Sequence, residues 1–541
     1  MNERAQGWLH FLYQKATTPD DWSKNGEPHP WWDRTSSPPM CAFPRFDLQE
    51  SAYAIALMCD QTPAWREVYV SILDEIAERF LTHWAAVDWL SQFGPDPARK
   101  DYPNEWKGTL IPQAFWGEYD APGWVANGVE PWGMQPDPIG ADGNLFFKGW
   151  LNLTQALYTY VSGYDKWAYP FMMTGVGTAR FEWTQHQLVD HLYEQWLNTP
   201  MGPHCENTKA WPYCLSAAGL GLLMYDNLFE KDAHMAYHQW RDYTEDQYYG
   251  FNTQGSLEWV TMYYDAQKNH NHITFPPMGL AIAFYALPQA PLFAEKLYRG
   301  AVNFMQWDKE GTEIASLPDP RMLALGLTCA KEMGDYRTEA RLRSFAEKHF
   351  EPRFFGLNDS QFGYWFNFGE NWPRGQLSAL AICSEIGEKG AWEKLFQRPN
   401  LSKYSAPTVA DIQYPEVGVA QAWHDDIEGC LYLELNSGNH TRCGQPTSFS
   451  IYNLPDASRV SIQCNGSTFT QFKIKSTDEI EVHTQIDHQK FEIRTHYHSA
   501  PNQGKTQIKP YDASGNQRTS ARTSRANTML WTPISHCGCC A

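Results

Sequence analysis

The sequence feature that most constrains the fold is a repeated pair of helical segments between about residues 48 and 400. In each pair an apolar segment rich in small residues is followed by a short turn and then by a more charged, amphipathic segment. The six pairs are 48–59 with 65–84, 146–161 with 179–197, 214–228 with 233–243, 277–287 with 292–304, 321–333 with 336–350, and 375–386 with 391–396. Because one pair cannot bury its apolar face alone, neighbouring pairs must stack.

Six antiparallel pairs, each with the less charged helix first, predict a mainly α fold of the (α/α)6 toroid or barrel type. The first helices would lie inside and the second helices outside. An open solenoid stays as the alternative, because periodicity does not show closure. The segments before the first helices of the pairs are predicted to be irregular and would lie together at one mouth of the barrel. Loops of this length are usually functional. These segments are 20–47, 86–145, 199–213, 247–276, 307–320 and 351–374.

The pattern changes after about residue 405. Segments with period-two alternation follow one another with Gly, Asn, Asp and Pro between them, which predicts an antiparallel sheet or sandwich. These segments are 417–423, 429–434, 447–453, 460–465, 468–474, 479–485 and 491–498. The predicted organisation is therefore a barrel over residues 1–404, a smaller antiparallel β domain over 405–498, and a disordered basic tail over 499–541.

Charge and composition limit the partners. The net charge is -19, and the first 500 residues contain no cluster of Lys and Arg, which disfavours nucleic acid and anionic membranes as partners. No leader sequence and no apolar run long enough to span a membrane are visible, so we expect a cytoplasmic protein with reduced cysteines. Aromatic residues make up 15% of the chain, and many stand in loops beside Pro and Gly. They indicate either an apolar or sugar-stacking cleft or simply a sealed helical core. A small neutral ligand fits this composition, and a homo-oligomer is left open.

Two thiols stand in a loop between helical segments. Cys205 and Cys214 are separated by eight residues, in a stretch with several Gly and Pro residues. This spacing is not that of a structural zinc site, whose ligands come in closely spaced pairs, so we predict no metal. A disulfide is disfavoured in a cytoplasmic protein. At the apolar mouth of the predicted barrel, such thiols would be weak hydrogen-bond donors or polarizable groups that line the pocket. Once deprotonated, a thiol could also be a nucleophile.

Two further loop elements collect groups that could react. In the first, Asp33 follows the indoles of Trp31 and Trp32 and precedes Cys41 by eight positions. Apolar neighbours would raise the pKa of this carboxyl and let it donate a proton near neutral pH, whereas a pairing with Arg34 or a helix-capping role is the simpler interpretation.

The second element runs from an aromatic loop into a predicted inner helix. Trp116 lies in Phe-Trp-Gly-Glu-Tyr, and Asp137-Pro-Ile comes before Lys148-Gly-Trp-Leu-Asn-Leu153. Trp150 in this last motif would face the central cavity.

These motifs together resemble the linalool dehydratase/isomerase family. The match consists of Asp-Pro-Ile, the Lys-Gly-x-Leu-Asn-Leu helix, Cys-Glu-x7-Cys entering a helix that ends in Tyr225-Asp226, and Glu332-Met-Gly-Asp335 in a later turn. It runs over about residues 30–400 and leaves the C-terminal β region uncovered. The resemblance implies an (α/α)6 barrel that uses no cofactor and that dehydrates or isomerises allylic terpene alcohols in an apolar pocket.

Carried over by the motifs, the resemblance makes Asp33 the catalytic aspartate, Cys41 a pocket thiol, and Cys205 and Cys214 the thiol pair beside the substrate. It also places Tyr263 or Tyr264 near a pocket tyrosine. The loop aromatics Trp32, Trp116, Trp150 and Trp211 would then line the pocket, and Glu206 would be available as a base.

The chain departs from the family pattern at two points. Trp150 stands where the family has a histidine, and a tyrosine expected between Asp33 and Cys41 is absent. Because acid and base groups are lost while the aromatic lining is kept, a terpenoid cyclase or a pericyclic enzyme, such as an intramolecular Diels-Alder catalyst, is the first alternative function. A polysaccharide lyase, which can combine a toroid with a β-sandwich, is the second.

Overall fold

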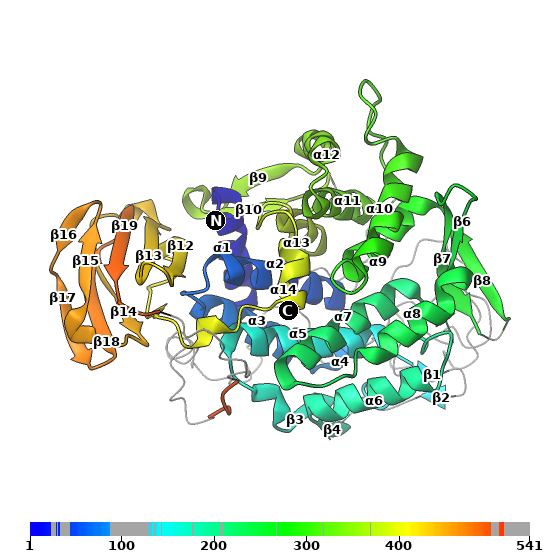
Figure 1. Cartoon of the computed structure of the whole chain (residues 1–541), viewed down its shortest axis with the longest axis horizontal. Coiled ribbons are helices and arrows are strands. Elements are labelled where there is room, and N and C mark those ends of the chain that lie inside the picture. Colours follow the sequence, from blue (N-terminus) through cyan, green and yellow to red (C-terminus); the bar gives the residue numbers. More distant parts are fainter. Residues whose placement is uncertain are drawn as a thin grey trace, which may run out of the picture.

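The computed structural model describes residues 1–22, 29, 31–32, 44–86, 129–130, 133–134, 137–141, 143–175, 178–205, 209–266, 268–317, 319–367, 369–498 and 508–512. Figure 1 shows strands β12–β19 at one end of the molecule, strands β6–β8 at the other, and helices between them. The expectation of a mainly helical chain with separate antiparallel sheets is confirmed. Within the described part, no helix has the length and apolar character needed to cross a membrane.

Six helices contact one another in a cycle. They are α2 (Pro44–Gln61), α5 (Leu145–Ser162), α7 (Pro212–Phe229), α9 (Gly279–Ala286), α11 (Pro320–Met333) and α13 (Gly375–Cys383). Each contacts the next in this order, and α13 contacts α2. Small residues permit this close packing: a Cβ atom added at Gly149 of α5 would lie 2.5 Å from the Cβ of Ala218 in α7. These six helices correspond to the first members of the predicted pairs.

A second set of helices packs against the outside of this cycle. It consists of α3 (Glu67–Phe80), α6 (Gln185–Leu197), α8 (Met235–Tyr248), α10 (Pro291–Met305) and α12 (Tyr336–His349), each of which contacts the inner helix that precedes it; the short α4 (His83–Ala86) follows α3. These helices have one buried and one charged face, which is the pattern of helices packed on a core from one side.

The second helix of the sixth predicted pair is present, but its expected outer position is wrong. Helix α14 (Ala391–Gln397) contacts α2, α7 and α11, so it lies across one end of the inner helices rather than outside α13. Trp392 explains this placement, because its indole is fully buried, stacks on Phe284 at 4.7 Å, and donates a hydrogen bond to the Phe284 carbonyl. Helix α1 (Glu3–Thr17), which the periodicity did not predict, contacts α3 and α13 in the place expected for the missing partner.

Several segments expected to be irregular form antiparallel strands. A four-stranded sheet contains β5 (Lys209–Ala210), β6 (Tyr249–Phe251), β7 (Leu257–Asp265) and β8 (His270–Thr274). Three two-stranded sheets pair β1 (Val129–Glu130) with β2 (Gly133–Met134), β3 (Phe171–Thr174) with β4 (Arg180–Trp183), and β9 (Pro352–Phe355) with β10 (Gln361–Tyr364). Most of these strands are too short to show a clear alternation, and the nine residues of β7 alternate only in part. Strand β4 corrects the predicted helix 179–197, because the chain there is extended over Arg180–Trp183 and becomes helical only at Gln185.

Two antiparallel sheets form the C-terminal region. One has the order β11 (Thr408–Ala410), β14 (Pro446–Tyr452), β18 (Glu479–Gln485), β17 (Phe472–Ser476); the other has the order β12 (Val417–Asp425), β13 (Cys430–Ser437), β19 (Gln489–Arg494), β15 (Ser461–Cys464), β16 (Ser467–Phe469). The predicted strand 468–474 is thus split between the two sheets, with a turn at its middle. The exact domain limits at residues 404 and 498 stay a prediction.

Backbone hydrogen bonds join this β region to the helices. The Ala64 amide donates to the Ala422 carbonyl, and the Val409 amide donates to the Ala64 carbonyl. The buried carboxylate of Glu67 in α3 accepts from the amides of Asp411 and Ile412 at 2.9 and 3.0 Å. The β region is therefore fastened to the first helix pair through main-chain groups.

Candidate functional site

A buried carboxyl group lies among the inner helices. Glu50 is in α2, is 1% exposed, and accepts a hydrogen bond from the Tyr213 hydroxyl of α7 at 3.4 Å. Its second oxygen, Oε2, is also buried, and the Gln376 side chain of α13 contributes a further hydrogen bond to the carboxyl. Burial raises the pKa of Glu50 well above its ordinary value, although Arg321 acts in the opposite direction. Burial therefore favours the protonated form of this carboxyl.

A cluster of aromatic rings begins at Tyr213, which contacts this carboxyl. Tyr213 packs edge-on against Phe146 of α5 at 5.0 Å, and Phe146 lies 3.7 Å from Trp150 one turn later. Phe46 of α2 closes the cluster, with its ring 4.7 Å from that of Trp150. Trp150 is fully buried, and its indole nitrogen has no hydrogen-bond partner among the described residues. Tyr213 keeps accessible surface. A cluster of this kind presents aromatic faces, which stabilise positive charge, next to a proton donor.

The two predicted thiols lie at the edge of this cluster. The Cys205 sulfur accepts a hydrogen bond from the Phe146 amide at 3.3 Å, and Cys214 lies in the first turn of α7 directly after Tyr213. Both are buried, and neither forms a disulfide. The loop that contains Cys205 is therefore bonded to the start of α5, one turn before Trp150.

A buried ion pair lies near the carboxyl and contacts the same aromatic cluster. The Arg321 guanidinium donates to both oxygens of Asp319, at 2.9 to 3.2 Å, and lies over the Phe46 ring. Asp319 also caps α11 by accepting from the Arg321 amide. Because the charges of Arg321 and Asp319 offset each other, this pair adds little net positive charge that would attract an anionic substrate.

Hydroxyl groups form the deeper part of the cluster. The hydroxyls of Tyr53 in α2 and Tyr285 in α9 are 2.8 Å apart, and the Tyr285 ring is 5.4 Å from that of Tyr213. The Trp392 ring lies 5.3 Å from Tyr53. The end of the inner helices that α14 crosses is therefore filled by side chains.

The other predicted residues fall in different places. Trp32 is buried under the Lys15 ammonium and near Arg79, against α1 and α3. Trp211, directly before α7, packs against Tyr263 of β7 at 5.1 Å, and Tyr263 stacks on His272. The Tyr264 hydroxyl donates to Asn269 at an exposed turn. Asp33, Cys41, Trp116 and Glu206 lie outside the described residues.

Glu50, Tyr213 and Arg321 are not among the residues that the sequence motifs single out. A signal was present for Glu50, because it is a carboxylate within an apolar inner segment, Leu48-Gln-Glu-Ser-Ala-Tyr-Ala-Ile-Ala-Leu57. Tyr213 directly precedes Cys214, and the motif around them points to the thiol as the functional group, not to the tyrosine. The motif Glu332-Met-Gly-Asp335 has a structural role: Gly334 ends α11 with a φ of 69°, Asp335 caps α12, and Glu332 accepts from the Trp392 amide.

Comparisons with known proteins support the motif-based resemblance. Residues 114–357 match the family model of linalool dehydratase/isomerase, a family of lyases and isomerases, so the predicted resemblance is confirmed over this segment. The comparison with curated proteins gives no match.

Two solved structures are similar over most of the chain. One is a GH127 beta-arabinofuranosidase, with 9% identity and a TM-score of 0.23 over 90% of this chain and 74% of that chain. The other is a GH127 beta-L-arabinofuranosidase from Geobacillus stearothermophilus T6, with 9% identity and a TM-score of 0.20 over 92% of this chain and 77% of that chain. TM-scores this low do not establish a common fold.

Proposed function

We propose that this protein is a cofactor-independent lyase or isomerase that acts on an allylic terpenoid alcohol at the centre of an (α/α)6 barrel. The cyclic contacts of the six inner helices support the barrel, and the family match over residues 114–357 supports this type of reaction. The observation that carries the proposal is the buried Glu50 carboxyl, with its raised pKa, among Tyr213 and the aromatic rings.

Glu50 can supply both proton transfers of a dehydration. The protonated carboxyl gives its proton to the substrate hydroxyl, the carbon–oxygen bond breaks, and water leaves together with the bonding electron pair. The allylic cation then loses a proton from a neighbouring carbon to the Glu50 carboxylate, which forms the new double bond and restores the acid. Return of water to the other end of the allylic cation gives the isomerised alcohol instead.

The neighbours of Glu50 suit this reaction. The rings of Tyr213, Phe146 and Trp150 can stabilise the allylic cation through their faces. In this proposal the polarizable thiols of Cys205 and Cys214 line the pocket, and Asp33 is a second proton donor. The pairing of Arg321 with Asp319 argues against a uronate substrate and hence against a polysaccharide lyase.

The test is a product analysis with allylic terpene alcohols and no added metal, in which wild type is compared with Glu50→Gln. We expect dehydration or isomerisation by wild type and a rate at least about 100-fold lower for the variant, which is the lower end of what general acid-base catalysis contributes. Glu75→Gln, on the outer helix α3, is the control and should keep full activity. Equal rates for Glu50→Gln and wild type would refute the role of Glu50.

A cyclase or pericyclic function is the second candidate. It is favoured by one observation: Trp150 replaces the ionisable family residue and adds an aromatic face to the Phe46 and Phe146 rings. Such an enzyme would fold a polyene so that the reacting carbons meet, and this proximity alone can contribute roughly 7 to 11 kcal/mol. Conversion of linear polyenes by both wild type and Glu50→Gln would support this second function over the first.

A further inference from the structure

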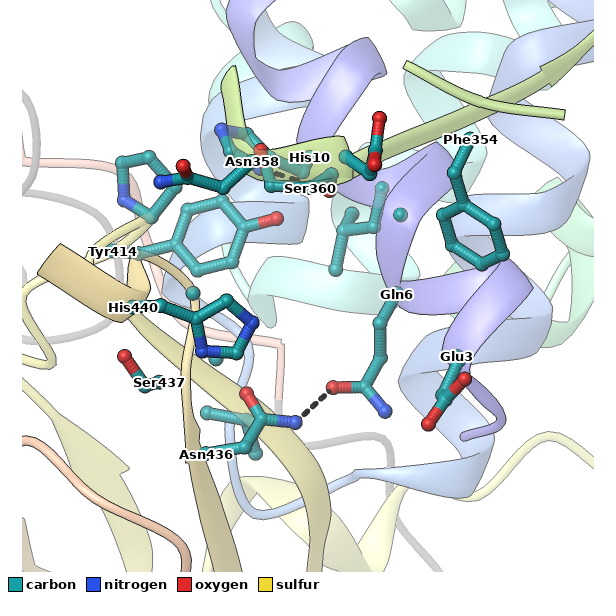
Figure 2. Close-up of a pocket in the computed structure, with 17 residues that line it drawn as sticks. Glu3, Gln6, His10, Phe354, Asn358, Ser360, Tyr414, Asn436, Ser437 and His440 are labelled. Atoms are coloured by element: carbon teal, nitrogen blue, oxygen red, sulfur yellow. Dashed lines mark hydrogen bonds between the residues drawn. The ribbon is translucent and has the colours of Figure 1, made fainter. Parts of the chain in front are cut away.

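A groove that shares no lining residue with the Glu50 cluster lies between helix α1, the β9–β10 hairpin and the β region. It consists of two hollows of about 340 and 540 Å³, a size typical of ligand sites. The two hollows share His10, Ser360, Pro415 and Gly438, so they are adjacent, and together they are called here the α1 groove. Figure 2 shows the first hollow, with Tyr414 and His440 on one side and Phe354 and Glu3 on the other.

The lining of the α1 groove is rich in amides and aromatic rings. The first hollow has the amides of Gln6, Asn358 and Asn436 beside the rings of Phe354 and Tyr414. The second hollow adds the rings of Tyr13, Trp31, Phe355 and Trp372 and the amides of Gln14, Gln361 and Asn439. None of the described residues lining either hollow is Lys or Arg, whereas Glu3, Asp359 and Glu416 are acidic. The groove therefore disfavours anions.

Hydrogen bonds hold several of these groups in place. The Asn436 amide donates to Gln6 Oε1 at 2.6 Å, which links β13 to α1 across the groove (Figure 2). Gly418 on the neighbouring strand makes room for this amide, since a Cβ there would lie 2.1 Å from Asn436 Oδ1. A site whose polar groups are fixed before binding loses less conformational entropy when a ligand arrives.

His10 has a defined hydrogen-bonding role. Its Nδ1 is 3.2 Å from the Ser360 carbonyl oxygen, which can only accept, so Nδ1 carries the proton and donates. Burial lowers the pKa of His10, which keeps the ring neutral and leaves Nε2 as an acceptor. Amides, a neutral imidazole and carboxylates together offer both donors and acceptors within a short distance, which is what a ligand with many hydroxyl groups requires.

We propose that the α1 groove binds a neutral oligosaccharide, with one sugar ring in each hollow. Hydroxyl groups would bond to Gln6, Asn436 and His440, and the C–H faces of the rings would pack on Tyr414 in one hollow and on Trp372 in the other. This ligand differs in class from the apolar substrate proposed for the Glu50 cluster, so the two proposals stand independently.

The experiment measures binding to the full-length protein by titration calorimetry and saturation-transfer NMR. Cellobiose, maltose and xylobiose serve as neutral probes, a digalacturonate as the anionic probe, and spermidine as the cationic probe, each up to about 10 mM, which detects weak complexes. We expect at least one neutral disaccharide to bind and the digalacturonate not to bind. Binding of spermidine alone, or of no neutral disaccharide, would overturn the proposal.

Three variants locate the site. His440→Ala changes an exposed side chain, and Asn436→Ala removes the amide that bonds to Gln6; each should weaken neutral disaccharide binding at least about tenfold. Trp423→Ala is the matched control, because Trp423 is a surface aromatic of the same β region that stacks on Tyr432 and lines neither hollow. Binding lost in Trp423→Ala but kept in His440→Ala would refute the α1 groove as the site, as would binding unchanged in all three variants.

Discussion

At the scale of single residues, the protonation state of Glu50 leads to a pH prediction. Its pKa is raised, chiefly by burial, and the proposed reaction begins with the protonated form. The rate should therefore be highest below this raised pKa and fall as pH rises through it, at a pH above the usual range of a glutamate. A pH–rate profile of kcat with an allylic alcohol checks this, and a rate that rises with pH over the same range would contradict it.

Trp150 leads to a second residue-scale prediction. Its ring is tilted against Phe146 at 3.7 Å and meets Phe46 edge-on at 4.7 Å, and Phe146 in turn contacts Tyr213. Trp150→Ala should change the ratio of products, because the folded shape of the substrate is no longer fixed. Cys205→Ala should lower the rate only modestly while keeping the product ratio. Gas chromatography of the products separates the two effects, and the reverse ranking would argue for a proton relay through the thiol.

Some residues of the candidate site can be predicted from the sequence, and others cannot. Cys205 and Trp150 were recognised because a loop thiol and an altered motif are visible in one segment. Glu50, Tyr213 and Arg321 come from three different helices, and only the packing of α2, α7 and α11 brings them together. Contacts between elements that are distant in the chain leave no local pattern. For this reason the sequence motifs point to a loop residue, Asp33, as the acid and not to a residue of an inner helix.

At the scale of elements, the contact between α5 and α7 leads to a prediction for Gly149. A methyl group at this position would lie 2.5 Å from the Cβ of Ala218 and 2.8 Å from its Cα. Gly149→Ala should therefore lower the free energy of unfolding by roughly 1 to 3 kcal/mol, the usual cost of overpacking. Denaturant unfolding measures the loss, and adding Ala218→Gly should restore part of it. A stability of Gly149→Ala equal to that of wild type would contradict the close packing.

The sequence pattern predicts the helices, but it does not predict which helix packs on the outer side of α13. Inner and outer helices differ in charge along the chain, so the first five pairs follow from periodicity. For α14 the same pattern predicts the wrong position. Its buried residues Trp392 and Phe396 pack on one end of the inner helices, and the helix does not lie on the outer side of α13. The outer position beside α13 belongs to α1, which is more than 350 residues earlier in the sequence. No repeat pattern contains that information.

At the scale of the whole molecule, Glu67 fastens the β region to the helices. Its carboxylate accepts from the amides of Asp411 and Ile412 and from the Trp65 indole at 3.2 Å. Burial nevertheless raises the pKa of Glu67 to about 7, so the folded protein binds a proton that the unfolded chain releases near pH 4.5. The contribution of this group to stability is therefore full at low pH and is lost as pH rises from about 4.5 to about 7.

This loss can be isolated by comparing wild type with Glu67→Gln, which cannot ionise. Other groups, such as His234, whose pKa burial lowers to about 4, titrate equally in both proteins and cancel in the difference. The free energy of unfolding of wild type relative to the variant should fall by up to roughly 3 kcal/mol between pH 4.5 and 7, and then stay level. Denaturant unfolding at a series of pH values measures it. A difference that rises with pH would mean that the three hydrogen bonds outweigh burial, so that Glu67 holds the β region as an ionised group.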